Sequence, residues 1–125
     1  MRDFKQLKVW QNAHEVTMKI YQSTISFPKE EQYGLISQMR RSSASVATNI
    51  AEGCGRSTEK EPAKCFDIAM GSASELEYQL LLAKDLNFLK PDDFQEINEA
   101  LIANEKQLNA FIQKLRKAKG QTAYR

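Results

Sequence analysis

Residues 94–115 read FQEINEALIANEKQLNAFIQKL, and their apolar side chains recur at alternating spacings of three and four. The positions on this row are Phe94, Ile97, Leu101, Asn104, Leu108, Phe111 and Leu115. Such a row lies along one side of an α-helix, and a helix buries it against other helices. The stretch therefore predicts one long helix of an α-helical bundle, with Asn104 as the only polar residue on its buried side.

Three earlier segments carry rows of the same kind, spaced by three or four residues. The rows are Val9, Ala13, Val16, Ile20 and Thr24; then Ile36, Met39, Ser43, Val46 and Ile50; then Phe66, Ala69, Ala73, Leu76, Leu80 and Ala83. Each row is long enough for a helix that crosses a small domain. The chain is therefore predicted to contain four helices.

Residues that end helices separate the four segments. These breaks are Ser26-Phe27-Pro28, Gly53 with Gly55, and Asn87 to Lys90. Two starts are open for the third helix: a capping box of Thr58 with Glu61, or Pro62 at the first helical position. Pro91, followed by two acids, is typical of the start of the fourth.

The short connections between segments predict antiparallel neighbours. Folding the first two segments together sets Ile20 beside Met39, and folding the middle two sets Arg40 and Arg41 near Glu75. The predicted fold is all-α, an antiparallel up-down-up-down four-helix bundle. A single domain is expected over residues 1–119, and residues 120–125 are expected to form a flexible C-terminal tail.

Composition indicates a folded domain, and the start of the chain and its cysteines lead us to expect it in the cytoplasm. The chain has 125 residues, of which 42% are hydrophobic and 27% charged, a balance that argues against intrinsic disorder. No apolar leader follows Met1, and the longest aliphatic run, at residues 80–83, is far too short to span a membrane. Cys54 and Cys65 form no CxxC pattern, so we expect reduced cytoplasmic thiols.

The sequence offers little that could carry catalysis. His14 is the only histidine, which excludes a carboxylate-bridged metal centre with two Glu-x-x-His pairs. Neither a glycine-rich phosphate loop nor a nucleophile elbow is present in the sequence. Glu75 and Glu77 point to different sides of a helix and are not an acid–base pair. We therefore expect no enzyme activity, no cofactor and no metal.

One stretch of the second helix carries no charge. Residues 42–51 read SSASVATNIA, and the third helix has a similar stretch at residues 68–74, where Gly71 costs roughly 1 kcal/mol against alanine. Small residues could serve a tight pair of helices within the chain. Alternatively, the face opposite the core is buried against another copy. The candidate oligomer interface comprises Ser45, Thr48, Asn49, Glu52, Gly71 and Ser74.

Basic residues gather at two places, although the net charge is only +2. The last twenty residues contain six cations and no acid. The candidate nucleic-acid-binding residues are Arg40, Arg41, Arg56, Lys114, Arg116, Lys117 and Lys119. A structural role is the alternative, because cations stabilise the C-terminus of a helix and the arginines could pair with Glu75 and Glu52.

Several short motifs occur together in this chain. They are LKVWQ at 7–11, FPKEEQYGL at 27–35, QMRRS at 38–42, NIAEG at 49–53 with Arg56, and IAMGS at 68–72 with ELE at 75–77. With these motifs the chain resembles the four-helix bundle proteins named for open reading frames in intervening sequences of bacterial 23S ribosomal RNA genes. The resemblance covers about residues 4 to 90. Ala47 is a departure, since members of that family often have proline there.

The resemblance implies a ring or barrel of five subunits and supplies no catalytic residue. It also implies similarity to the accessory variability determinant of diversity-generating retroelements, a basic pentameric partner of a reverse transcriptase that binds nucleic acid. The positions to test first lie within the motifs: Arg40, Arg41, Asn49, Glu52, Gly53 and Arg56.

Two functions follow as hypotheses for a cytoplasmic, non-enzymatic homo-oligomer. One is an accessory factor that binds RNA or DNA. The other is an oligomeric protein–protein scaffold with no nucleic-acid role. The expected partners of the chain are copies of itself, RNA or DNA, or another protein. We expect no contact with a membrane.

Overall fold

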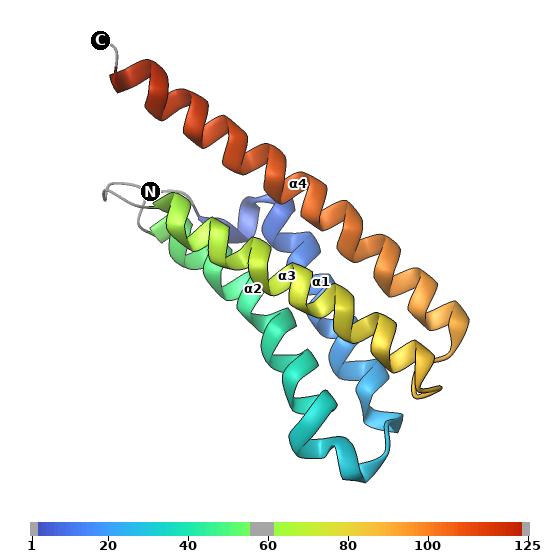
Figure 1. Cartoon of the computed structure of the whole chain (residues 1–125). Helices are drawn as coiled ribbons and strands as arrows, with labels where there is room; N and C mark the ends of the chain where they lie inside the picture. The colour runs from blue at the N-terminus through green and yellow to red at the C-terminus, as the bar shows by residue number, and fades with distance from the viewer. Residues whose placement is uncertain (1–2, 56–61, 124–125) are drawn as a thin grey trace.

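A computed structural model describes residues 3–55 and 62–123 of the chain, the side chains of 62–63 and 119–123 excepted. Four long helices make up most of it: α1 (Lys8–Ser23), α2 (Ser37–Gly55), α3 (Pro62–Asp85) and α4 (Pro91–Ala123) (Figure 1). Within these described ranges there is no strand. The prediction of an all-α four-helix bundle is confirmed.

The four helices surround one core. Each packs on the helix before or after it in the chain, and α4 also packs on α1. In Figure 1 the chain turns back between α1 and α2 and between α3 and α4 at the same end of the bundle, which we call the turn end. The bundle therefore has four outer faces, which we name by their helices: α1/α2, α2/α3, α3/α4 and α1/α4.

Short helical turns connect α1 to α2 at the turn end. They are the 3-10 turns Thr24–Ser26 and Lys29–Glu31 and a π turn at Gln32–Ile36. The Glu31 carboxylate accepts a hydrogen bond of 3.1 Å from the Leu35 backbone N–H and so caps this turn. A further 3-10 turn, Phe4–Gln6, precedes α1.

The predicted rows form the core. All members of the first and third rows are buried, as is Asn104 on the fourth. The fourth row shifts toward its C-terminal end, where Phe111 is only partly buried and Ile112 takes the core position. An α-helix has 3.6 residues per turn, so a strict seven-residue row drifts out of the core along a long straight helix.

The helix boundaries agree closely with those expected. Pro62 is the first residue of α3, whereas Thr58 and Glu61 lie outside the described residues. Gly53 does not end α2 but is buried inside it, where it packs against α3. A Cβ at this position would lie 2.6 Å from Cζ of Phe66, so the close approach requires glycine. At the other end, α4 continues through Ala123, beyond residue 119, where the domain was expected to end.

Candidate functional site

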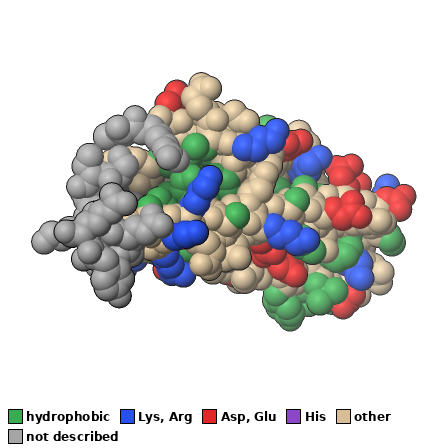
Figure 2. All heavy atoms as spheres, turned by 90° about the horizontal axis from the view of Figure 1, so that it is seen from above, with side chains coloured by type: hydrophobic (Ala, Val, Ile, Leu, Met, Phe, Trp, Pro, Cys, Tyr) green, Lys and Arg blue, Asp and Glu red, His purple; other side chains and the backbone are tan. Residues whose placement is uncertain are grey.

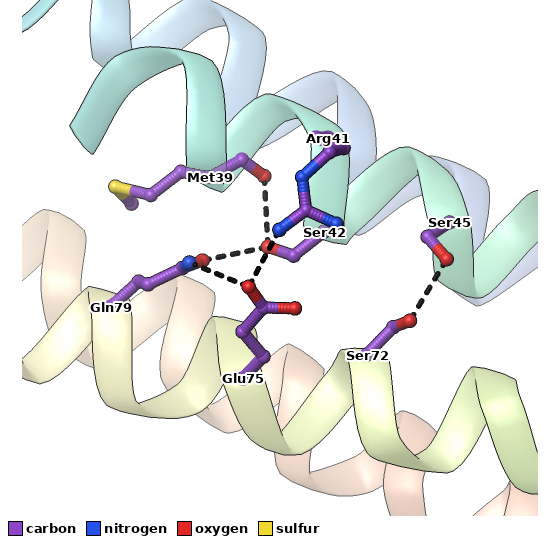
Figure 3. Close-up of polar contacts among 7 residues, drawn as sticks. All are labelled: Met39, Arg41, Ser42, Ser45, Ser72, Glu75 and Gln79. Carbon is purple, nitrogen blue, oxygen red and sulfur yellow. Dashed lines mark hydrogen bonds and ion pairs between the residues drawn. The ribbon is translucent and has the colours of Figure 1, made fainter. Parts of the chain in front are cut away.

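The charge-free stretch of α2 lies partly against α3 in the same chain. Ser45 Oγ and Ser72 Oγ are 2.8 Å apart, and Arg41 Nη2 donates to Glu75 Oε2 at 2.7 Å (Figure 3). The predicted approach of Arg41 to Glu75 is therefore present. Short serine side chains let the two backbones come close, so part of the missing charge is explained within one subunit.

A buried polar chain continues from this contact. The Ser42 hydroxyl lies 2.7 Å from Gln79 Oε1, and Gln79 Nε2 donates to the Glu75 carboxylate at 3.3 Å (Figure 3). Ser42 and Gln79 are almost fully buried, so their partners offset the cost of removing them from water. These residues hold α2 against α3 and leave Arg41 with its charge paired.

The structure divides the predicted oligomer interface among several places. Ser45 contacts Ser72, and Asn49 Nδ2 donates to the Ser45 carbonyl at 2.8 Å, so both are engaged within the subunit. Thr48 and Glu52 line a groove on the α1/α2 face. On α3, Gly71 is exposed with open space where a Cβ would stand, and Ser74 lines a groove on the α3/α4 face.

The α1/α2 groove is mostly apolar. Small residues of α2 and ring-bearing residues near the start of the chain form its walls: Phe4, Trp10, His14, Thr17, Ala44, Ala47, Thr48, Ala51 and Glu52. The rings of Trp10 and His14 are stacked, with centroids 5.1 Å apart. His14 therefore packs on an aromatic ring. Among the described residues no three His, Cys, Asp or Glu side chains are grouped to hold a metal ion.

Arg40 does not turn toward Glu75, and that part of the prediction is wrong. Its Nε donates to Thr24 Oγ1 at 2.9 Å, its Nη2 lies 3.3 Å from the Tyr21 carbonyl, and its guanidinium lies 4.8 Å from the centre of the Tyr21 ring. Neighbouring residues on a helix point in different directions, so Arg41 contacts α3 while Arg40 contacts α1. Arg40 has no ion pair with any described carboxylate.

The C-terminal cations differ in their surroundings. Arg116 donates to both carboxylate oxygens of Asp67 at 2.9 Å, which neutralises its charge. Lys114 and Lys117 are exposed and make no ion pair within the described part of the chain. Arg56 and the side chain of Lys119 lie outside the described residues.

Lys114 and Lys8 both line a groove on the α1/α4 face. Sequence reasoning did not single out Lys8. The lining of this groove consists of Leu7, Lys8, Val9, Gln107, Ala110, Phe111 and Lys114, and we call it the basic groove. It lies at the end of the bundle opposite the turn end, whereas Arg40 contacts the last turn of α1 near the turn end. Among the described residues, Arg40 and Lys114 therefore lie near opposite ends of the subunit.

Charge is unevenly distributed on the surface. On the face shown in Figure 2, basic side chains predominate beside the grey residues, and acidic and basic side chains alternate toward the other end. Elsewhere in the described chain, Lys19 and Glu96 form an ion pair of 2.8 Å. The net charge of +2 thus averages over a mixed surface and a more basic end.

A pair of carboxyl groups was also missed from sequence. Glu77 of α3 hydrogen-bonds to Glu105 of α4, and both are half-buried. Burial, followed by the hydrogen bond and negative charge of Glu77, raises the pKa of Glu105 to about 7. Spacing along one helix could not reveal this pair, because its members belong to different helices.

The two cysteines lie buried near the same end of the α2–α3 pair. The Cys65 thiol is 3.9 Å from the Glu52 carboxylate. None of the described helices combines the length and the apolar content that crossing a membrane requires.

Comparison with known proteins gives a family and a fold. The family model described as 23S rRNA-intervening sequence protein matches residues 5–110. A crystal structure of a protein of unknown function from the S23 ribosomal protein family of Bacteroides thetaiotaomicron superimposes with a TM-score of 0.76. It is 22% identical, and the match covers 84% of this chain and 95% of that chain. No curated protein matches the sequence significantly.

Proposed function

The chain belongs to the 23S rRNA-intervening sequence protein family, and from this premise we propose that it is a non-enzymatic, homo-oligomeric protein that binds nucleic acid, in particular RNA. The basic groove on the α1/α4 face is the proposed contact. The assembly we propose is the five-subunit ring that the family resemblance implies. Such a ring would repeat the groove around its circumference.

The observation that carries this proposal is the pair Lys8 and Lys114 at an apolar groove. Neither lysine has a carboxylate partner among the described residues. Ammonium groups of this kind attract phosphates, and the apolar side chains that line the groove suit contact with an unpaired base. Single-stranded RNA has both chemical groups, which is why we favour it.

Oligomerisation strengthens the argument from charge. One subunit has a net charge of only +2, a weak field for a polyanion. Repeated grooves let several subunits bind one strand, and linked contacts raise the overall affinity well above that of a single groove. The proposed ring and the proposed ligand therefore support each other.

A salt series tests nucleic-acid binding. Binding of a fluorescent single-stranded RNA is measured by filter retention from about 50 to 200 mM salt, and we expect the affinity to fall steeply. Lys8→Glu and Lys114→Glu should each weaken binding and flatten the salt slope. The matched control is Lys29→Glu, an exposed lysine on the connection between α1 and α2. A weak signal that does not change with salt would reject this function.

A protein–protein scaffold is the second candidate. It is favoured by exposed apolar side chains around the turn end: Ile25 is 77% exposed, Tyr33 92% and Leu86 47%. Exposed apolar clusters of this kind mark protein contacts. An oligomer that binds no RNA, and loses a co-purifying protein on Tyr33→Ser and Ile25→Ser substitution, would favour this candidate.

A further inference from the structure

On the α1/α2 face, Arg40 has no carboxylate partner within the described part of the chain. Arg40 is held over the Tyr21 ring by its bonds to Thr24 and the Tyr21 carbonyl. Exposed apolar side chains recur on α1 and just beyond it, three residues before and four after Tyr21: Met18 (47% exposed), Tyr21 (42%) and Ile25 (77%). We call these three residues and Arg40 the Arg40 patch. Its guanidinium is fixed in place before any partner arrives, so little side-chain entropy remains to be lost on binding.

On the α3/α4 face, Glu77 and Glu105 make no ion pair with any described cation. A groove there is lined by Ser74, Glu77, Tyr78, Leu81, Phe94 and Asn98, and Glu105 joins Glu77 beside it; we call this the acidic groove. Tyr78 and Leu81 are exposed, so the groove is apolar as well as acidic. Lys84 does not neutralise the pair but lies over the Phe94 ring, 4.6 Å from its centre. Burial and the neighbouring Glu77 carboxyl raise the pKa of Glu105.

These two surfaces lie on opposite faces of the bundle, since α1 and α2 pack across the core from α3 and α4. They also lie at the same height along it. The contact between Arg41 and Glu75 places this turn of α2 beside the turn of α3 that precedes Glu77. Glu105 is at the height of Glu77, to which it is hydrogen-bonded.

We propose that the acidic groove of one subunit binds the Arg40 patch of a second copy of this chain. The Arg40 guanidinium would donate to the Glu77 and Glu105 carboxylates, as a planar guanidinium does in paired hydrogen bonds. Met18, Tyr21 and Ile25 would cover Tyr78 and Leu81. This proposal rests on the proposed homo-oligomer and names the surfaces that form it.

A second copy is the occupant because one chain supplies both halves. Charge, apolar content and height all match between the two faces, and an unrelated partner would not be expected to match all three. Gly71 and Ser74 on α3 present no bulky side chain beside the groove, so a neighbouring helix could approach closely. Contacts between two different faces repeat head to tail, and they close into a ring when the rotation between subunits allows it.

The arrangement also leaves the proposed RNA site open. The basic groove lies on the α1/α4 face, which neither the Arg40 patch nor the acidic groove occupies. Subunits joined through the α1/α2 and α3/α4 faces would each keep this groove accessible. Self-association and RNA binding can therefore be tested separately.

Charge reversal tests the contact. Self-association of the full chain is measured by analytical ultracentrifugation from low to high micromolar concentration, with helix content checked by circular dichroism. We expect Arg40→Glu to weaken association at least about tenfold, since it places three acids together. Glu105→Lys should weaken it less, because the new lysine pairs with Glu77. The double variant Arg40→Glu/Glu105→Lys should recover most of the loss.

Controls separate this contact from the oligomer itself. Lys29→Glu changes charge by the same amount on an exposed connection and should leave association unchanged. Arg40→Gln can keep a hydrogen bond to Thr24, so it removes the charge with less risk to the fold. A wild-type monomer would overturn both proposals. An oligomer that tolerates Arg40→Glu and Arg40→Gln, or one that the double variant fails to restore, would overturn this contact alone.

Discussion

The α2–α3 and α1–α4 pairs are both polar where they meet, but in different ways. Across α2 and α3 the partners are short, such as Ser45 with Ser72, and the backbones make the most extensive contact in the bundle. Across α1 and α4 longer amides meet: Asn12 Nδ2 donates to Gln107 Oε1 at 2.8 Å, and Asn104 Nδ2 to the Val9 carbonyl at 3.0 Å.

The α2–α3 contact is closed by its own hydrogen bonds, whereas the α1–α4 contact leaves a groove that a ligand could enter. Short side chains use their hydrogen bonds within the α2–α3 pair, and Arg41 is neutralised there by Glu75. Long amides between α1 and α4 leave room beside them, and the basic groove opens next to Gln107. The charge-free stretch of α2 thus indicated close packing on α3. The proposed ligand site lies instead between α1 and α4, where the helices pack less closely.

The largest expected effect is at the close contact between α2 and α3. Gly53→Ala should destabilise the protein by about 2–3 kcal/mol, because the new Cβ would lie 2.6 Å from the buried Phe66 ring. Chemical denaturation at a single protein concentration measures this change.

The matched control for Gly53→Ala is Gly71→Ala, in the middle of α3. A Cβ there meets nothing within 4 Å in the subunit, so the substitution should stabilise the fold by up to about 1 kcal/mol. Equal effects at the two glycines would contradict the close packing of α2 on α3.

A smaller loss is expected from the buried polar chain. Ser42→Ala removes the 2.7 Å partner of Gln79 Oε1 and should cost about 1–2 kcal/mol, since a buried acceptor is left unpaired. Thermal and chemical unfolding should both report it. In the double variant Ser42→Ala/Gln79→Leu much of the loss should return, because both polar partners are then absent.

The same kind of change between α1 and α4 should have less effect. Asn104→Leu places an apolar side chain on the buried row, and Gln107 still accepts from Asn12. Stability should change by no more than about 1 kcal/mol in either direction. A loss larger than that of Ser42→Ala would reverse the proposed contrast between the two pairs.

The acid pair between α3 and α4 gives the smallest effect, and it depends on pH. The pKa of Glu105 is raised from 4.5 to about 7 by burial and by Glu77, so the folded state holds a proton that the unfolded state has released. The contribution of the Glu105 carboxyl to the free energy of unfolding is therefore fully present below pH 4.5, and it is lost as the pH rises through 7. Glu105→Gln should be more stable than wild type at pH 8 and nearly equal at pH 4, as thermal unfolding at the two pH values would show.

Much of the fold could be predicted because helix periodicity is local. The row from Val9 to Thr24 is wholly buried, and Pro62 begins α3 as one of the two alternatives had it. The position of Arg41 beside Glu75 followed from folding two segments about a short connection. Arg40 was misplaced because one residue along a helix turns a side chain toward a different neighbour.

The candidate sites were harder to predict. Lys8 and Lys114 are about as far apart in the sequence as the chain allows, and only the packing of α4 on α1 brings them to one groove. Glu77 and Glu105 meet in the same way across α3 and α4. The sequence showed that residues 42–51 carry no charge. It could not show which charged residues from different helices would share an outer face of the bundle.

The sequence by itself determined the four helices, most of the breaks between them and most of the side that each one buries, because hydrophobic spacing and helix-ending residues act over a few turns. Only the tertiary structure decided how the outer faces are composed. A face is built from two helices, so its charge depends on their relative rotation and height. That is why Ser45 belongs to a contact within the subunit, Arg40 lies over Tyr21 without an ion pair to any described carboxylate, and burial beside Glu77 raises the pKa of Glu105.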